Sequence, residues 1–307
     1  MGAGHEHHHD HRNPAPSAGR GKAFALAVLL NVGFTIAEVV AGLISGSMAL
    51  IADAGHNLSD VLSLLLAWGA SVLALRPPSA RFTYGLKSSS ILAAIANAAL
   101  LWVALGAILV ETIRRFSDPE PVAGGVMMIV AGIGIVINTL SAMLFAAGRK
   151  SDLNLRAAFL HLMADAAVSA GVVVAGLLVV LTGTRWIDPA TSLLITGVIA
   201  WGSWGLLRDA VKMGLLAVPE GIDEAQVRSF LASQPGVSAV HDLHIWPMST
   251  TETAMTAHVV MPEGHPGDPF LHGLAHELHH RFGIGHPTLQ IETQTGAECA
   301  LESEAVV

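Results

Sequence analysis

Six apolar runs occupy the first two thirds of this chain, and they constrain its fold more than any other feature. Each run is close to the ~20 residues that a helix needs to cross a ~30 Å hydrocarbon core. The first run follows a polar, histidine-rich stretch and lacks a cleavage-like end, so it is predicted to be a membrane helix and not a signal peptide. The predicted spans are 24–44, 49–74, 90–111, 122–147, 158–182 and 190–208.

The charge content supports a membrane protein. Only 13% of the 307 residues are charged and 52% are hydrophobic, whereas an ordinary soluble domain has roughly 25% charged residues. A water-soluble globular enzyme is therefore excluded, and the net charge of -8 excludes a nucleic-acid partner held by a basic surface. The single cysteine, Cys299, leaves no disulfide framework and no thiolate-based zinc cluster within one chain.

Basic residues flank the runs unevenly, which predicts that both termini of this multi-pass protein are cytoplasmic. On the other side of the membrane we expect only Arg114, Arg115 and Arg185. The expected cytoplasmic set is Arg12, Arg20, Lys22, Arg76, Arg81, Lys87, Arg149, Lys150, Arg156, Arg208 and Lys212.

After about Leu216 the sequence acquires charges, alternation and turns, as a soluble domain does. The patterns predict helices at 223–234 and 268–282 and strands at 237–247, 251–262 and 287–294. This order is typical of a small α+β domain with helices on one face of a sheet. We therefore expect four parts: a disordered tail (1–22), a transmembrane domain (23–212), a cytoplasmic domain (213–295) and a flexible tail (296–307).

Two of the predicted spans each contain a histidine and an aspartate four residues apart, His56 with Asp60 and His161 with Asp165. Residues i and i+4 share a helix face about 5–6 Å apart, so two such faces can form a cage with four ligands. Two imidazoles and two carboxylates suit tetrahedral Zn²⁺, and they also admit Co²⁺ or Cd²⁺. Asp53, one turn before His56, is a candidate accessory ligand or a helix cap.

Two alternatives compete with a transport site. Each His-Asp pair is also compatible with a hydrogen bond that joins neighbouring helices. The same cage would also suit a membrane-bound metal sensor or an intramembrane zinc hydrolase, which would bind metal or turn over substrate without flux. In a transporter, protons and metal would compete for the same atoms, which supplies a basis for antiport.

The sequence resembles the cation diffusion facilitators. The similarity is carried, in family order, by "SGSMALIADAGHNLSDVLSLLLAWGA", "PVAGGVMMIVAGIGIVIN", "NLRAAFLHLMADAAVSAGVVVAGLL", "WIDPATSLLI", "VPEGID" and "VHDLHIW". The resemblance implies a homodimer of six-helix subunits with cytoplasmic metallochaperone-like domains. We expect the protein to lie in a bacterial inner membrane. It implies a secondary transporter, not an enzyme, that exports divalent metal, with zinc as the cation indicated by the His-Asp/His-Asp set.

One loop departs from the family pattern. Before the third span the chain reads "YGLKSSS", with Ser88 and Ser90 where the family commonly has a basic and an acidic residue. The departure bears on how the membrane part couples to the cytoplasmic domain, and Lys87 is a candidate to replace the missing cation by pairing with Asp209.

The other histidines form two groups outside the membrane. A tract of His5, His7, His8, His9 and His11 can collect zinc weakly near the cytoplasmic mouth. By resemblance, His241 and His258 match positions that bind regulatory metal in some family members, and Glu292 lies near a third such position. Gln290 stands where a histidine would complete that pattern.

Overall fold

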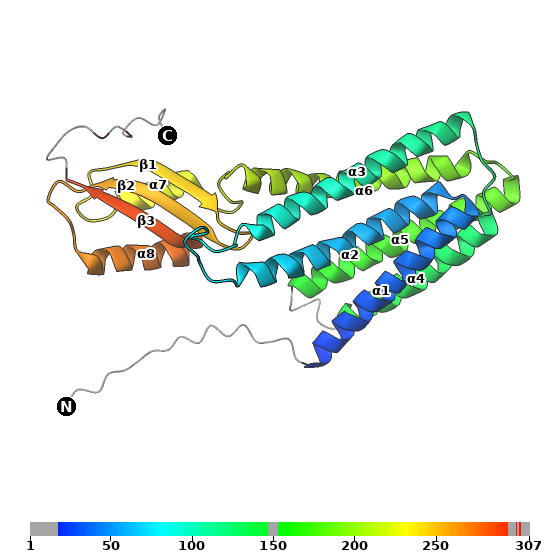
Figure 1. Cartoon of the computed structure of the whole chain (residues 1–307), viewed down its shortest axis with the longest axis horizontal. Helices are drawn as coiled ribbons and strands as arrows, with labels where there is room; N and C mark the ends of the chain where they lie inside the picture. The colour runs from blue at the N-terminus through cyan, green and yellow to red at the C-terminus, as the bar shows by residue number, and fades with distance from the viewer. Residues whose placement is uncertain (1–17, 147–152, 294–298, 300, 302–307) are drawn as a thin grey trace. The chain divides into compact units, whose positions relative to one another are not determined.

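Six long helices precede a small α+β domain in the computed structural model, which describes residues 18–146, 153–293, 299 and 301 (Figure 1). The helices of the first part are α1 (Ala18–Ser45), α2 (Met48–Ala74), α3 (Ser89–Ser117), α4 (Gly124–Ala146), α5 (Leu153–Thr182) and α6 (Ile187–Gly214). The second part contains α7 (Glu224–Ala232), β1 (Ala239–Pro247), β2 (Thr253–Val260), α8 (Asp268–Phe282) and β3 (Ile284–Glu292). The predicted fold class is confirmed.

Most helices of the first part have the length and composition of membrane spans. Among the described residues, 5 helices are long and apolar enough to cross a membrane, and Leu29–Ser45 of α1 forms a shorter apolar helix. The helix α1 begins at Ala18, so residues 18–22 are helical although they were assigned to a disordered tail. The helix is longer than the apolar run because a polar residue ends the run but can still continue the helix.

Contacts along the chain define two compact units, Met1–Val61 with Val103–Ile199 and Leu62–Trp102 with Ala200–Val307. In the first unit α4 packs along α5 and against α1. The approach of α4 to α5 is close because glycines face it: a Cβ on Gly176 would lie 2.8 Å from Cγ of Met128. Small residues that let two helices approach closely are typical of helix packing in membranes.

The start of α2 is held by a residue from α6. Ser47 caps α2, since its Oγ accepts a hydrogen bond from the Leu50 N–H at 3.2 Å, as N-cap serines do. The buried carboxylate of Asp188 then accepts hydrogen bonds from Ser47 Oγ (2.5 Å), Met48 N (2.7 Å) and Ala49 N (3.2 Å). A carboxylate at this end of a helix also complements its dipole, so Asp188 fixes the point where α2 begins.

The C-terminal domain, within the second unit, is a three-stranded sheet in the order β1-β2-β3 with two helices. Strands β1 and β2 are antiparallel, and β2 and β3 are parallel. One core cluster joins Val227 and Leu231 of α7, Leu274 and Leu278 of α8, and Ile245 of β1. Both helices therefore cover the same face of the sheet, as the sequence pattern predicts.

The "YGLKSSS" loop forms an ion pair and hydrogen bonds with the segment that connects β1 to β2. Both segments lie within the second unit. Lys87 forms an ion pair with Glu252, whereas Asp209 pairs with Arg208, so the expected partner of Lys87 was wrong. Ser88 Oγ donates to the Met248 carbonyl at 3.2 Å, and Ser90 Oγ accepts from Thr250 N at 3.1 Å. The two serines thus supply short neutral contacts where the family commonly has charges.

Candidate metal centres

The two His-Asp pairs meet between α2 and α5. Nε2 of His161 lies 3.1 Å from Oδ2 of Asp60 and 3.6 Å from Oδ2 of Asp165. Nε2 of His56 lies 3.7 Å from Oδ2 of Asp60 and 3.6 Å from Oδ1 of Asp165. Each imidazole therefore faces both carboxylates, one from its own helix and one from the other.

The four side chains differ in how tightly they are gathered and in how exposed they are. One donor atom each from His56, His161 and Asp165 lies within 4.8 Å of the other two. Asp60 contacts both imidazoles but stands outside that tightest group. Asp165 is 6% exposed and His161 is 47% exposed, so one side of the cluster is buried and the other side is accessible.

Asp53 does not join this cluster, although its spacing puts it on the same helix face as His56. It is fully buried, and its Oδ2 accepts a hydrogen bond from Ser169 Oγ at 3.2 Å. Glu38, also fully buried, accepts a hydrogen bond at its Oε2 from Asn57 Nδ2 at 3.0 Å. Asp53 therefore lies outside the group of closely spaced donor atoms from His56, His161 and Asp165.

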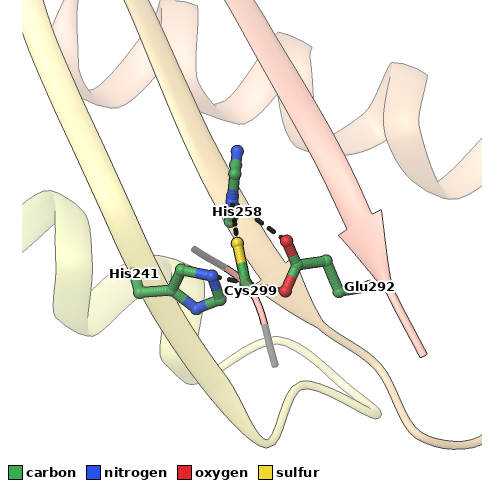
Figure 2. Close-up of side chains that lie close together, drawn as sticks. All are labelled: His241, His258, Glu292 and Cys299. Carbon is green, nitrogen blue, oxygen red and sulfur yellow. Dashed lines mark hydrogen bonds and ion pairs between the residues drawn. The ribbon is translucent and has the colours of Figure 1, made fainter. Parts of the chain in front are cut away.

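A second group of donors lies on the three-stranded sheet, where one donor atom each from His241, His258, Glu292 and Cys299 lies within 4.8 Å of the others (Figure 2). In the strand register His241 is opposite His258, and Glu292 is opposite Val260. Side chains two residues apart on a strand share a face, so His258 and Glu292 lie together on the face away from the helices.

A β-bulge brings His241 to this face. The register advances three residues on β1, from His241 to His244, against two on β2, from His258 to Thr256. Strict alternation would place His241 on the core face with Leu243 and Ile245. The extra residue reverses that alternation, as bulges do, and the rings of His241 and His258 then lie 5.1 Å apart between centroids.

Cys299 was missed as a candidate ligand. Its Sγ lies 3.5 Å from Nδ1 of His258, and the same nitrogen lies 3.0 Å from Oε1 of Glu292. Gln290, which stands where a histidine was expected, donates its Nε2 hydrogen to Oε1 of Glu292 at 3.0 Å. No spacing motif could have shown this, because the donors come from separate strands and from the segment beyond the last strand.

The side chains of Glu292 and Cys299 each shift the pKa of the other. Burial raises the pKa of Glu292, but hydrogen bonds from Cys299 and Gln290 and the charges of the two histidines outweigh it, so this pKa is below its ordinary value. A backbone hydrogen bond from Leu301 lowers the pKa of the Cys299 thiol. Desolvation and the carboxylates of Glu292 and Asp242 outweigh that effect, and the pKa is raised. At neutral pH the thiol is therefore protonated beside an ionised carboxylate.

The remaining candidates lie outside the described residues. The histidine tract at 5–11 falls in the stretch before Ala18, and the predicted flexible tail is described only at Cys299 and Leu301. Both therefore remain predictions.

Family models match both parts of the chain. The cation efflux transmembrane domain matches residues 24–213, and the cytoplasmic domain of cation efflux proteins matches residues 219–294. The matched segments include the pairs on α2 and α5 and the donors on the sheet, except for Cys299.

Curated relatives align over most of the chain. The zinc transporter ZitB of Escherichia coli is 39% identical over 273 residues, which is 88% of this chain and 87% of that protein. A cadmium, cobalt and zinc/H(+)-K(+) antiporter of Bacillus subtilis is 33% identical and covers 88% of each chain. The metal cation efflux system protein CzcD of Cupriavidus metallidurans is 35% identical over 87% of this chain and 85% of that protein.

Among solved structures, the metal-bound C-terminal domain of the CzcD transporter from Cupriavidus metallidurans matches at 35% identity and a TM-score of 0.21. It covers 23% of this chain and 99% of that one. With a family model over most of its length and relatives that align across more than four fifths of it, this chain is a multi-pass membrane transporter of the cation efflux family, the cation diffusion facilitators.

Proposed function

We propose that this transporter exports Zn²⁺ from the cytoplasm in exchange for protons, and that His56, Asp60, His161 and Asp165 bind the ion in transit. The observation that carries the proposal is that each imidazole of the cluster faces a carboxylate from both α2 and α5, at 3.1 to 3.7 Å. Ionisable groups within membrane helices are costly, and they mark ion or proton paths by default.

The donor set favours zinc and its close chemical relatives. Two imidazole nitrogens and two carboxylate oxygens suit tetrahedral Zn²⁺, and they also bind Co²⁺ and Cd²⁺, whereas Mg²⁺ and Ca²⁺ prefer all-oxygen sites. The names of the relatives support this range: one is a zinc transporter, and another is an antiporter of cadmium, cobalt and zinc.

Proton coupling follows from the charges of the cluster. Two carboxylates within a membrane span are strongly destabilised when no cation accompanies them, so protons would replace the metal when it leaves. Histidine titrates near pH ~6.5 when unperturbed, so an acidic exterior favours protonation and release, and a near-neutral cytoplasm favours metal binding. Exchange then requires that the site open to one side at a time.

The proposal is tested by zinc flux into inverted membrane vesicles, whose outer surface corresponds to the cytoplasmic side. An acidic lumen is expected to drive Zn²⁺ uptake, and a protonophore is expected to stop it. A K⁺ gradient alone should drive none. Zinc binding without flux would overturn the proposal in favour of a sensor, and uptake that ignores the pH gradient would remove the proton coupling.

We also propose that both termini are cytoplasmic in the inner membrane and that two chains form a homodimer, as the positive-inside pattern and the family resemblance lead us to expect. Cys299 is the single cysteine of the chain and serves as a native probe. In chelator-treated intact cells, a membrane-impermeant maleimide is expected to leave Cys299 unlabelled, and in inverted vesicles it is expected to label it.

The matched control for this topology is Asp118→Cys in a Cys299→Ser background. Asp118 is exposed at the end of α3 that should face away from the cytoplasm, so this variant should label in intact cells. Labelling of Cys299 in intact cells would reverse the proposed orientation.

A further inference from the structure

We propose that His276 and His280, on the exposed side of α8, together bind one Zn²⁺ ion, with water completing its coordination. The pair holds an exchangeable ion on the outer surface of the C-terminal domain. It shares no residue with the donors on the sheet or with the proposed transport site, and it requires neither of those sites to be correct.

The first support is the position of the two histidines on the helix. They are four residues apart in the segment "HELHH" of α8, and residues i and i+4 lie on one face of a helix. Both side chains are exposed. The inward side of α8 is held by Leu274 and Leu278, which are buried in the core of the domain. A helix that packing keeps in place therefore presents both imidazoles to solvent.

The second support is the distance between the two rings. The ring centroids of His276 and His280 lie 5.0 Å apart, and the ring planes are tilted by 44°. A tetrahedral Zn²⁺ ion with Zn–N bonds of ~2.0–2.1 Å holds the centroids of two imidazole ligands roughly 5 Å apart. The separation of the rings therefore already suits a shared ion.

The third support is the electrostatic setting at this end of α8. His280 lies in the last turn of the helix, where the helix dipole favours a cation. Arg281, the neighbouring cation, donates a hydrogen bond from Nε to Oε2 of Glu277 at 2.6 Å. This ion pair reduces the repulsion between Arg281 and a bound metal, so the helix end favours a divalent ion at the pair.

The surroundings of the pair indicate binding and not hydrolysis. The segment fits the H-E-x-x-H pattern of zinc peptidases, in which the glutamate is the general base, but here Glu277 is paired with Arg281. Among the described residues, His276 and His280 do not group with a third metal-binding side chain within 4.8 Å. Structural zinc sites have four protein ligands, so an ion held by two remains exchangeable.

Chelation distinguishes this pair from an isolated surface histidine. Once one imidazole binds the ion, the second binds it within the same molecule and therefore at a high effective concentration. Each of the two histidines should consequently bind zinc well only when the other is present. Imidazole suits Zn²⁺, whereas Mg²⁺ and Ca²⁺ prefer oxygen ligands, so the pair should select zinc over these two ions.

The test measures the reactivity of single histidines in the full-length protein in detergent, after treatment with a chelator. Diethyl pyrocarbonate modifies a free imidazole nitrogen, and mass spectrometry of the digested protein reports the extent at each residue. Micromolar Zn²⁺ is expected to slow modification of His276 and His280 together, and Mg²⁺ is expected to have no effect. His265, an exposed histidine in the loop before α8, should react at the same rate with and without zinc.

Reciprocal variants test whether the two histidines share one ion. His276→Ala should abolish the protection of His280 by zinc, and His280→Ala should abolish that of His276. Both positions are exposed and alanine favours a helix, so the fold should be retained. His265→Ala is the matched control and should leave the protection of both histidines intact. Asp165→Ala, which alters only the proposed transport site, should do the same.

Three results would overturn the proposal. One is an absence of protection at both histidines. Another is protection of His280 that persists in His276→Ala, because each imidazole would then bind zinc alone. The third is equal protection of His265, which would show that zinc binds any exposed histidine of this domain. Each of these results leaves the transport site untouched, since its own test is vesicle flux.

Discussion

Asp165→Ala is expected to reduce zinc uptake into inverted vesicles to the level of vesicles that lack the transporter. Asp165 is the most buried member of the cluster, and its carboxylate lies 3.6 Å from both imidazoles. Its loss would remove one of the two proposed anionic ligands and leave Asp60 as the only carboxylate among the four proposed ligands. Because it lies on α5 while His56 lies on α2, His56→Ala should give the same loss. The measurement is pH-driven zinc flux at matched protein levels.

The control must separate a lost ligand from a weakened bundle. Asp165→Asn preserves the shape of the side chain and one oxygen, so it should retain a folded protein and still lose most of the flux. Asp118→Ala removes an exposed carboxylate just after the end of α3 and should transport as the unmodified protein does. Unmodified rates in His56→Ala and Asp165→Ala would contradict the assignment. A lower melting temperature with normal flux would favour the alternative of interhelical hydrogen bonds.

The membrane helices were predictable because one physical quantity, the thickness of the hydrocarbon core, sets the length of the apolar runs. The run at 49–74 became Met48–Ala74, and the run at 122–147 became Gly124–Ala146. The pairing of His56 with Asp60 and of His161 with Asp165 was equally accessible, because the helical repeat alone puts residues i and i+4 on one face.

The surroundings of the cluster were not predictable in the same way. Spacing along α2 put Asp53 beside His56, but the packing of other helices decides which polar group each carboxylate meets. Ser169 of α5 donates its hydrogen bond to Asp53, and the carboxylate of Asp53 lies outside the tightest donor group. A one-dimensional pattern gives the face of a helix but not its neighbours.

The donors on the sheet show a second limit of prediction from the sequence. Alternation along "VHDLHIW" assigns His241 to the same face as Leu243, and only the irregular register between His241 and His244 moves it to the face of His258. A bulge has no strong local signature when its residue is aspartate and not glycine. Cys299, which lies beyond the last strand, could not be placed beside His258 by spacing along the sequence.

Asp188→Ala is expected to destabilise the membrane part by about 3 kcal/mol, because hydrogen bonds to a charged group contribute ~1.5–3 kcal/mol each and buried donors are costly to leave unpaired. The variant deprives Ser47 Oγ, Met48 N and Ala49 N of their acceptor. It also removes the negative charge that complements the start of α2. The apparent melting temperature of the purified protein should fall by several degrees.

Loss of the Asp188 contacts should also disturb the proposed transport site, because His56 lies about two turns from the start of α2. Without its anchor on α6, α2 is free to rotate or slide, and metal ligands tolerate shifts of only about 0.5 Å. Zinc flux should therefore fall together with stability, although Asp188 contacts none of the four proposed ligands. Asp188→Asn keeps an acceptor oxygen. Both its stability and its zinc flux should therefore fall less than those of Asp188→Ala. A melting temperature equal to that of the unmodified protein in Asp188→Ala would show that the ends of α2 and α6 are held by other contacts.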